Sequence, residues 1–139
     1  MRIFLDANIL FSAAKSAGAV RELLRRTEGA GHSLCADTYV VGEARRNLAI
    51  KSHEALSAFD AMLARIQIAP YSPTMLPADI GALLPEKDRP VLAAAIRLRC
   101  GALVTGDKKH FGVLYGCEVD AVTVRSPLSL ANALGIIAK

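Results

Sequence analysis

Acidic side chains follow two apolar runs of the sequence, at the point where each run ends. Asp6 comes directly after residues 1–5, and Asp107 comes directly after residues 102–106. A carboxylate at the edge of an apolar core has lost part of its solvation, so it needs a hydrogen-bond partner, a counter-ion or a metal. Asp6 and the nearby Asn8 also suit turns and helix caps. Whether these residues do chemistry therefore depends on which other groups reach the same place.

Two further acids stand beside expected helices. Asp88 precedes an expected helix at 89–100, and Glu43 lies in the first turns of another at 39–50. Each acid taken alone has an ordinary explanation, as a turn residue, a helix cap or part of a solvated helix face. Glu86, two residues before Asp88, is a competing candidate at the same place.

The elements that must position these acids alternate along the chain. Short apolar runs predict strands at 1–5, 33–36, 66–70, 102–106 and 119–124. Amphipathic spacing predicts helices at 17–29 (capped by Ser16), 39–50 (started by Asp37 or Thr38), 53–66, 89–100, within 107–116, and at 128–137. Strands that alternate with helices indicate an α/β fold with a parallel sheet. The strands are continuously apolar, which is typical of a sheet covered on both faces.

This arrangement brings the four acids toward one edge of the sheet. In such folds ligands bind at the carboxyl ends of the strands, where Asp6 and Asp107 lie, and the helices bearing Glu43 and Asp88 begin near the same edge. Like charges gathered in one cleft repel each other, so such a cluster normally persists because a cation occupies it. Oxygen ligands without His or Cys favour Mg²⁺ or Mn²⁺.

Bulk composition narrows the class of protein. The 139 residues are 53% hydrophobic and 22% charged, which excludes a disordered chain and suits one domain over 1–139. No apolar run is long enough to span a bilayer, and the amino terminus lacks a signal-like pattern, so we expect a soluble, cytoplasmic protein without a membrane partner. The three cysteines predict reduced, buried side chains. The formal charge of +4 suits a polyanionic partner without establishing one.

The stretch LDANILF, Glu43, the block DRPVLAAAIRLRCGALVTGD and the closing SPLSLANAL together resemble a PIN domain. The resemblance covers essentially the whole chain and is strongest to small bacterial and archaeal PIN proteins, many of them VapC-like toxins. It implies a three-layer α/β/α sandwich around a mainly parallel five-stranded sheet. It also implies a metal-dependent endoribonuclease that cleaves single-stranded RNA, as the toxin of a type II toxin–antitoxin pair with a cognate antitoxin.

The resemblance carries over to particular residues. The catalytic acids would be Asp6, Glu43, Asp88 and Asp107, with Asn8 and Thr105 as polar supports. A Mg²⁺ or Mn²⁺ ion would be held by Asp6, Asp88 and Asp107, with Asp88 ranked above Glu86 by motif alignment. Positive charge for the RNA backbone would come from Arg21, Arg25, Arg45, Arg46, Lys108 and Lys109. We also expect a homodimer through a helical face, because the helical segments 19–26 and 56–66 carry more apolar residues than one core is expected to absorb.

One position departs from the family pattern. Where many members have a further Asp before the Phe of the last motif, this chain has His110 before Phe111. We therefore expect one tightly held ion, with a second ion held weakly. A haloacid-dehalogenase-type phosphatase is disfavoured because such a phosphatase needs a second Asp where this chain has Asn8. A P-loop protein is excluded because the sequence has no glycine-rich GK[ST] stretch. The rival interpretation is a catalytically silent PIN-like module that binds RNA or a protein.

Overall fold

A single six-stranded sheet organises the computed structural model, which describes residues 1–136. The strand order is β3-β2-β1-β4-β6-β5, and every neighbouring pair is parallel except β5 with β6. The strands are β1 (Arg2–Leu5), β2 (Ser33–Asp37), β3 (Gln67–Ala69), β4 (Ala102–Val104), β5 (Glu118–Val119) and β6 (Val122–Arg125).

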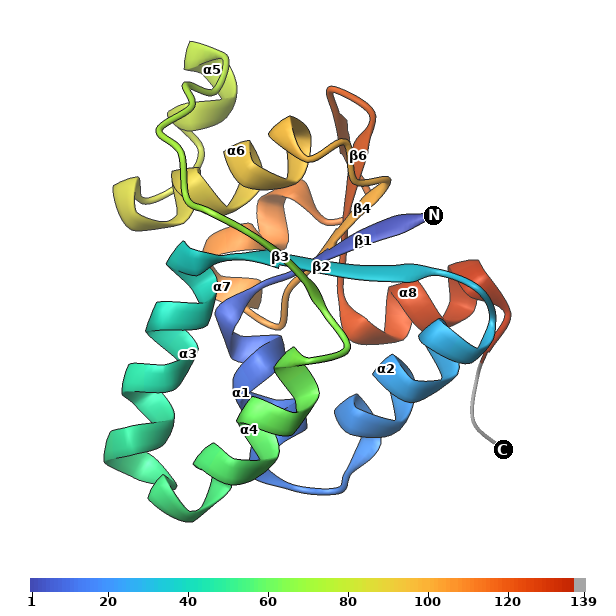
Figure 1. Ribbon diagram of the computed structural model, residues 1–139. Helices are drawn as coiled ribbons and strands as arrows, with labels where there is room; N and C mark the ends of the chain where they lie inside the picture. The colour runs from blue at the N-terminus through green and yellow to red at the C-terminus, as the bar shows by residue number, and fades with distance from the viewer. Residues whose placement is uncertain (137–139) are drawn as a thin grey trace.

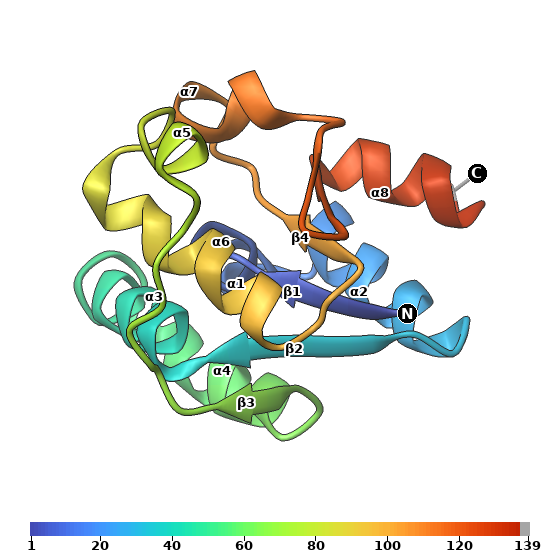
Figure 2. The ribbon, with the colours of Figure 1, turned by 90° about the horizontal axis from the view of Figure 1, so that it is seen from above.

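Helices cover both faces of this sheet. They are α1 (Ala7–Lys15), α2 (Ala19–Gly29), α3 (Thr38–Lys51), α4 (Leu56–Leu63), α5 (Ala78–Gly81), α6 (Arg89–Arg97), α7 (Lys108–Phe111) and α8 (Pro127–Leu134), with short 3₁₀ turns at His53–Ala55, Glu86–Asp88 and Gly112–Leu114. Helices α1 to α4 lie below the sheet in Figure 1, α8 lies beside α2, and α6 lies above the sheet. Figure 2 shows the strands between these helices from above. The expected α/β class with a mainly parallel, doubly covered sheet is confirmed.

The sheet has one strand more than expected. The sequence predicted a single strand over 119–124, whereas the chain makes a hairpin there, with β5 antiparallel to β6. Asp120 and Ala121 form the two-residue turn with φ angles of 47° and 71°. Left-handed backbone at both positions matches the twist of a tight hairpin, so the apolar run is cut in two.

A helix directly after β1 was missed from the sequence. The apolar residues of α1 face the interior, and Asp6 is its N-cap, accepting a hydrogen bond from the Ala7 amide at 2.7 Å. Ser16 therefore follows α1, and Gly18 rather than Ser16 is the N-cap of α2. Asp37 does cap α3, as expected, by accepting a hydrogen bond from the Val40 amide.

The final helix is shorter than the predicted range 128–137. Helix α8 ends at Leu134 because Gly135 takes a left-handed conformation with φ 67°, a common way to end a helix. Residue 137, at the end of the predicted range, lies outside the described residues.

The apolar residues of α2 and α4 pack into the core. Leu23, Leu24 and Phe59 are buried, and Val20 and Met62 pack against the same cluster. The apolar excess that motivated a homodimer is therefore largely absorbed within one chain, and self-association stays a prediction. Within residues 1–136, no helix combines the length and the apolar character needed to cross a membrane.

The hairpin turn yields a stability prediction. Ala121→Gly should raise the melting temperature by a few degrees, because the left-handed conformation costs an alanine about 1 kcal/mol that glycine avoids. The matched change Ala49→Gly, at an exposed position inside α3, should lower the melting temperature by a similar amount. Thermal unfolding followed by circular dichroism measures both. Equal destabilisation by the two changes would contradict the left-handed turn.

Candidate metal centre

Asp6 lies at the point where the sheet changes its direction of winding. From β1 the chain continues to β2 through helices on one face, and it enters β4 from α6 on the other face. Leu5 pairs with Val104, and the Asp6 amide donates a hydrogen bond to the Val104 carbonyl at 3.1 Å, so Asp6 and Thr105 leave the sheet side by side. Open α/β sheets bind ligands in the crevice at such a point.

The Asp6 carboxylate is held by residues from both strand ends. Thr105 Oγ1 donates to Asp6 Oδ2 at 2.8 Å, and Asn8 Nδ2 donates to the same oxygen at 3.2 Å. Asn8 Oδ1 in turn accepts from the Gly106 amide at 2.8 Å. A Cβ at Gly106 would lie only 3.3 Å from this Asn8 oxygen, so the small residue permits the close approach. The expected supports Asn8 and Thr105 thus contact Asp6 directly.

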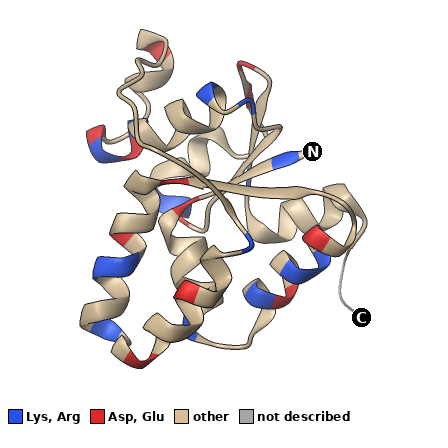
Figure 3. Cartoon of the chain, viewed as in Figure 1, with Lys and Arg blue, Asp and Glu red and all other residues tan. Residues whose placement is uncertain are grey.

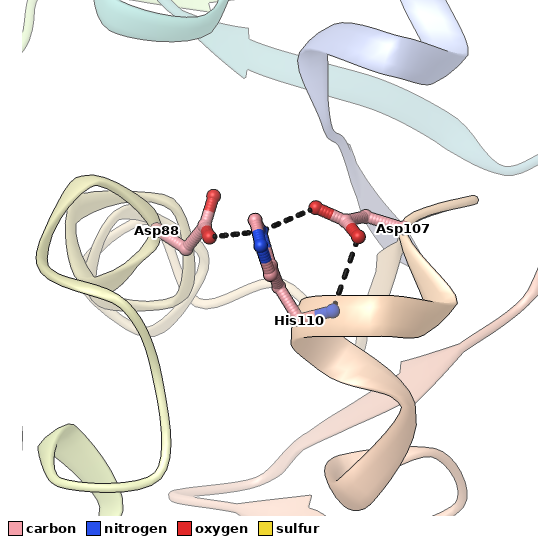
Figure 4. Close-up of side chains that lie close together, drawn as sticks. All are labelled: Asp88, Asp107 and His110. Carbon is pink, nitrogen blue, oxygen red and sulfur yellow. Dashed lines mark hydrogen bonds and ion pairs between the residues drawn. The ribbon is translucent and has the colours of Figure 1, made fainter.

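Asp107 and Asp88 meet across the ring of His110. His110 Nδ1 lies 2.9 Å from Asp88 Oδ2 and 2.9 Å from Asp107 Oδ2, with one carboxylate on each side of the ring (Figure 4). Asp107 is also the N-cap of α7, because its Oδ1 accepts a hydrogen bond from the His110 amide. Asp88 is buried at the start of α6. The turn that carries it is tied to α3 because Tyr39 donates from its hydroxyl to the Lys87 carbonyl at 2.7 Å.

The acids raise one another's proton affinity. Burial raises the pKa of Asp6 to about 6, hydrogen bonds from Thr105 and Ala7 oppose this rise, and the charges of Glu43 and Asp88 add to it. Burial also raises the pKa of Asp88, with a further contribution from Asp107 and opposition from His110. The carboxylates are therefore close enough to repel each other, and a bound cation would relieve that repulsion.

The donor set suits a divalent cation. Among residues 1–136, one group of three can offer ligand atoms within 4.8 Å of each other, and it consists of Asp88, Asp107 and His110. Asp88 Oδ2 and His110 Nδ1 are buried and have no well-directed hydrogen bond, although they lie 2.9 Å apart. Buried polar atoms in this state need a partner. A divalent ion bound by the two carboxylates and the imidazole would be such a partner.

The structure brings together most of the acids expected from the sequence. Asp6, Asp88 and Asp107 reach one edge of the sheet, and Glu43 lies near Asp6 and Asn8, where it lines a groove between α1 and α3. Glu86 is exposed and lines a different pocket, next to α5, so the geometry favours Asp88. The compact group of three nevertheless contains His110 in the place expected for Asp6.

The expected RNA-contacting residues are scattered. Arg21 donates hydrogen bonds to the Ala13 and Ala14 carbonyls at the far end of α1, Arg25 pairs with Glu22, and Arg45 pairs with Asp60. These arginines therefore have structural partners away from the acids. Lys108 and Lys109 are exposed and follow Asp107 directly, so the basic start of α7 lies beside the acidic edge (Figure 3). Arg46 is exposed on α3.

The sequence alone did not single out the groove that leaves this edge. It runs between α1 and α3, has a volume of about 160 Å³, and is lined by Asn8, Phe11, Glu43, Asn47 and Lys51. The ammonium groups of Lys15 and Lys51 lie 5.7 Å and 6.0 Å from the centre of the Phe11 ring. One sequence signal could have indicated this groove. Asn47 and Lys51 follow Glu43 by four and eight residues, so the three side chains share one face of a helix.

Comparison with known proteins gives similarity in structure only. No family model and no curated protein matches the sequence. The structure is similar to a chain of VapBC2 from Rickettsia felis bound to a promoter DNA fragment, with a TM-score of 0.66 and 18% identity over 91% of this chain and 98% of that chain.

Two other solved structures are also similar. VapC20 from Mycobacterium tuberculosis, described as a sarcin-ricin loop cleaving toxin, gives a TM-score of 0.51 with 14% identity over 73% of this chain and 86% of that chain. A chain of FitAB bound to an IR36 DNA fragment gives a TM-score of 0.56 with 16% identity over 90% of this chain and 94% of that chain. The resemblance to a PIN domain is thereby confirmed as regards the fold.

The raised pKa of Asp6 predicts a pH-dependent effect of Asp6→Asn. The folded protein keeps the Asp6 proton up to about pH 6, whereas the unfolded chain releases it near 3.8, so the wild type loses stability as pH rises between these values. Without metal, Asp6→Asn should therefore melt a few degrees higher at pH 7.5, and the gain should disappear near pH 4. Melting curves in EDTA across this range measure the effect.

The exposed Asp79 of α5 provides the matched control. Asp79→Asn should leave the melting temperature unchanged at both pH values, because this carboxylate is solvated. Asparagine at position 6 can still accept the Ala7 amide hydrogen bond that caps α1. If Asp6→Asn melts lower at pH 7.5 in EDTA, Asp6 is a structural cap rather than a member of a repelling cluster.

Proposed function

We propose that this chain is a divalent-metal-dependent endoribonuclease that cleaves single-stranded RNA and acts as the toxin of a type II toxin–antitoxin pair. The observation that carries the proposal is the gathering of Asp6, Asp88 and Asp107 at the crevice between β1 and β4, where the buried Asp88 Oδ2 makes no well-directed hydrogen bond. The similarity in fold to VapC20, a toxin described as cleaving the sarcin-ricin loop, supports the reaction class.

The carboxylates would hold a Mg²⁺ or Mn²⁺ ion, with Asp88 and Asp107 as its nearest ligands and Asp6 facing the same crevice. Bound there, such an ion would supply positive charge to a phosphate oxygen and lower the pKa of the attacking water. Thr105 and Asn8 fix the orientation of the Asp6 carboxylate through their hydrogen bonds. Without those contacts the carboxylate could rotate away from the productive geometry.

Glu43 is our candidate for the group that orients the water and accepts its proton. It is half-buried on α3, beside Asn8 in the groove, and its charge acts on Asp6. It stands outside the compact group formed by Asp88, Asp107 and His110, so it remains free to contact water or substrate. A general base needs to reach the proton it removes directly or through one water, and Glu43 lines the groove beside Asn8.

The RNA backbone would pass over the exposed side chains nearest to the acids. Lys108 and Lys109 stand at the start of α7 on one side, and Lys51 lies at the end of the α1–α3 groove on the other. Lysine ammonium groups bind phosphates by charge and release counter-ions, which gives sequence-independent affinity. The route therefore uses fewer arginines than the sequence predicted.

A protein partner is inferred from the similar structures. VapBC2 and FitAB are two-component assemblies that were solved with DNA fragments, and each contains a chain with this fold. We infer that this chain likewise pairs with a cognate antitoxin that blocks its activity. An apolar groove between α2 and α8, lined by residues such as Leu23 and Leu128, is one surface open to a partner or to a second copy.

The proposed activity predicts metal-dependent cleavage. The purified protein should cut single-stranded RNA when Mg²⁺ or Mn²⁺ is present, EDTA should abolish cutting, and restored metal should recover it. Asp107→Asn should lower the cleavage rate by at least about 100-fold. Changing a residue that only orients a metal ligand already costs up to about 100-fold in activity, and losing the ligand itself should cost no less. Asp79→Asn serves as the control with unchanged rate. Gel analysis of labelled RNA measures cleavage, and a filter-binding assay measures RNA affinity.

The same assays separate the rival function. A protein that binds RNA tightly but never cuts a broad RNA panel with either metal would contradict the nuclease and favour the silent binding module. Cleavage that persists in EDTA, or that Asp107→Asn retains, would contradict the metal centre and indicate a contaminating nuclease or a different mechanism.

The proposed RNA route predicts unequal effects of basic residues. Replacing Lys108 and Lys109 together by Gln should raise KM several-fold and reduce the steepness of its salt dependence, with kcat little changed, because phosphate contacts are lost near the acids. Arg25→Gln should leave KM unchanged, because Arg25 pairs with Glu22 and lines a different pocket, between α2 and α4. A larger KM effect from Arg25→Gln would place the RNA over α2 instead.

A further inference from the structure

We propose that His110 is itself a metal ligand, through Nδ1, and that it makes this centre prefer a transition-metal ion such as Mn²⁺ over Mg²⁺. The inference rests on the proposed metal-dependent function and names the metal that serves it. The sequence interpretation treated His110 as the loss of an acidic ligand. The structure places its ring between the carboxylates of Asp88 and Asp107.

The first observation is the spacing of the three donor atoms. His110 Nδ1 lies 2.9 Å from Asp88 Oδ2 and 2.9 Å from Asp107 Oδ2. In an octahedral site with ligands about 2.1 Å from the ion, neighbouring ligand atoms are about 3.0 Å apart. The two separations therefore match adjacent ligands of one ion, and all three donor atoms lie within 4.8 Å of one another.

The second observation is that two of these three atoms make no well-directed hydrogen bond. Asp88 is 8% exposed, yet its Oδ2 and the His110 Nδ1 have no hydrogen bond of acceptable direction, although they lie within hydrogen-bond distance. A histidine that merely bridged two carboxylates would point an N–H at one of them. An ion on the Nδ1 lone pair would instead have a carboxylate oxygen on each side, as the ring is placed in Figure 4.

The local fold holds the ring in this position. Asp107 caps α7 by accepting the His110 amide hydrogen bond at 3.1 Å, which fixes the two residues relative to one another. The next residue, Phe111, is fully buried and anchors the helix in the core. Asp88 approaches from the other side because α6 begins there, tied to α3 through Tyr39 and the Lys87 carbonyl.

The donor chemistry decides the choice of metal. Mg²⁺ binds oxygen almost to the exclusion of nitrogen, whereas imidazole is a good ligand for first-row transition ions. Two carboxylates with one imidazole can bind Mn²⁺ through all three donors, while Mg²⁺ would gain little from the nitrogen. The exchange of an acidic residue for His110 thus changes the metal selectivity rather than removing a site.

The test reads the ligand directly and needs no catalysis. Mn²⁺ added to the full-length protein at less than one equivalent should show electron spin-echo modulation from a directly bound ¹⁴N nucleus. His110→Asp should remove this signal and lower the ratio of Mn²⁺ to Mg²⁺ affinity, measured by calorimetry, by about tenfold. His53→Asn, at an exposed histidine before α4, is the matched control and should keep both the signal and the ratio. Circular dichroism verifies that each variant is folded.

The outcomes separate this inference from the proposed function. Mn²⁺ that binds the wild type without nitrogen modulation would overturn the role of His110, whatever the variants do, while metal-dependent RNA cleavage would still support the nuclease. A ratio of affinities unchanged in folded His110→Asp would also overturn it. Failure of the wild type to bind any divalent ion would contradict both the inference and the proposed nuclease.

Discussion

The burial of carboxylates at the crevice between β1 and β4 is the constraint on which this structure depends. Asp6 is 5% exposed, and its ionised form is tolerated there because Thr105, Asn8 and the Ala7 amide all donate to it. Those donors come from two parts of the fold, because Thr105 follows β4 whereas Ala7 and Asn8 form the first turn of α1. The same contacts therefore fix how β1 and β4 end relative to one another.

The burial of Asp6 lowers the stability of the metal-free protein at neutral pH, while it places a carboxylate at the proposed metal site. The hydrogen bonds lower the pKa of Asp6 only in part, so burial and the neighbouring charges of Glu43 and Asp88 still raise it to about 6. A protein selected for stability alone would replace such a residue by a neutral one. The burial of these acids, with Asp88 Oδ2 and His110 Nδ1 lacking well-directed hydrogen bonds, is expected of a site that a bound ligand stabilises.

Several basic side chains form hydrogen bonds within the chain and so contribute to the fold rather than to a binding surface. Several arginines complete the backbone hydrogen bonding of loops and helix ends: Arg21 reaches the end of α1, Arg89 reaches the Gly81 and Leu84 carbonyls, and Arg97 reaches the Pro70 and Ser72 carbonyls. The contacts of Arg89 and Arg97 hold the segment between β3 and α6, which carries Asp88 toward the site. The net charge of +4 is therefore a poor guide to where a polyanion would bind.

The sequence by itself determined the class of fold and the edge where the acids gather. Continuously apolar strands alternating with capped helices require a doubly covered parallel sheet, and a parallel sheet places the residues after β1 and β4 at one edge. Asp37 and Pro90 marked helix starts by local chemistry alone. Local signals did not separate α1 from the strand before it, because both are apolar, and they did not reveal the hairpin, because Asp120 and Ala121 lack the glycine typical of such turns.

Only the tertiary structure decided which donors share a site. Asp88 and His110 are 22 positions apart in the sequence, and their contact arises because α6 crosses one face of the sheet before β4 leads to α7. Residue types predict which groups can bind a cation, and strand ends predict the edge that they occupy. The distances among side chains depend on how helices pack across the sheet, and packing is a long-range property that no local pattern encodes.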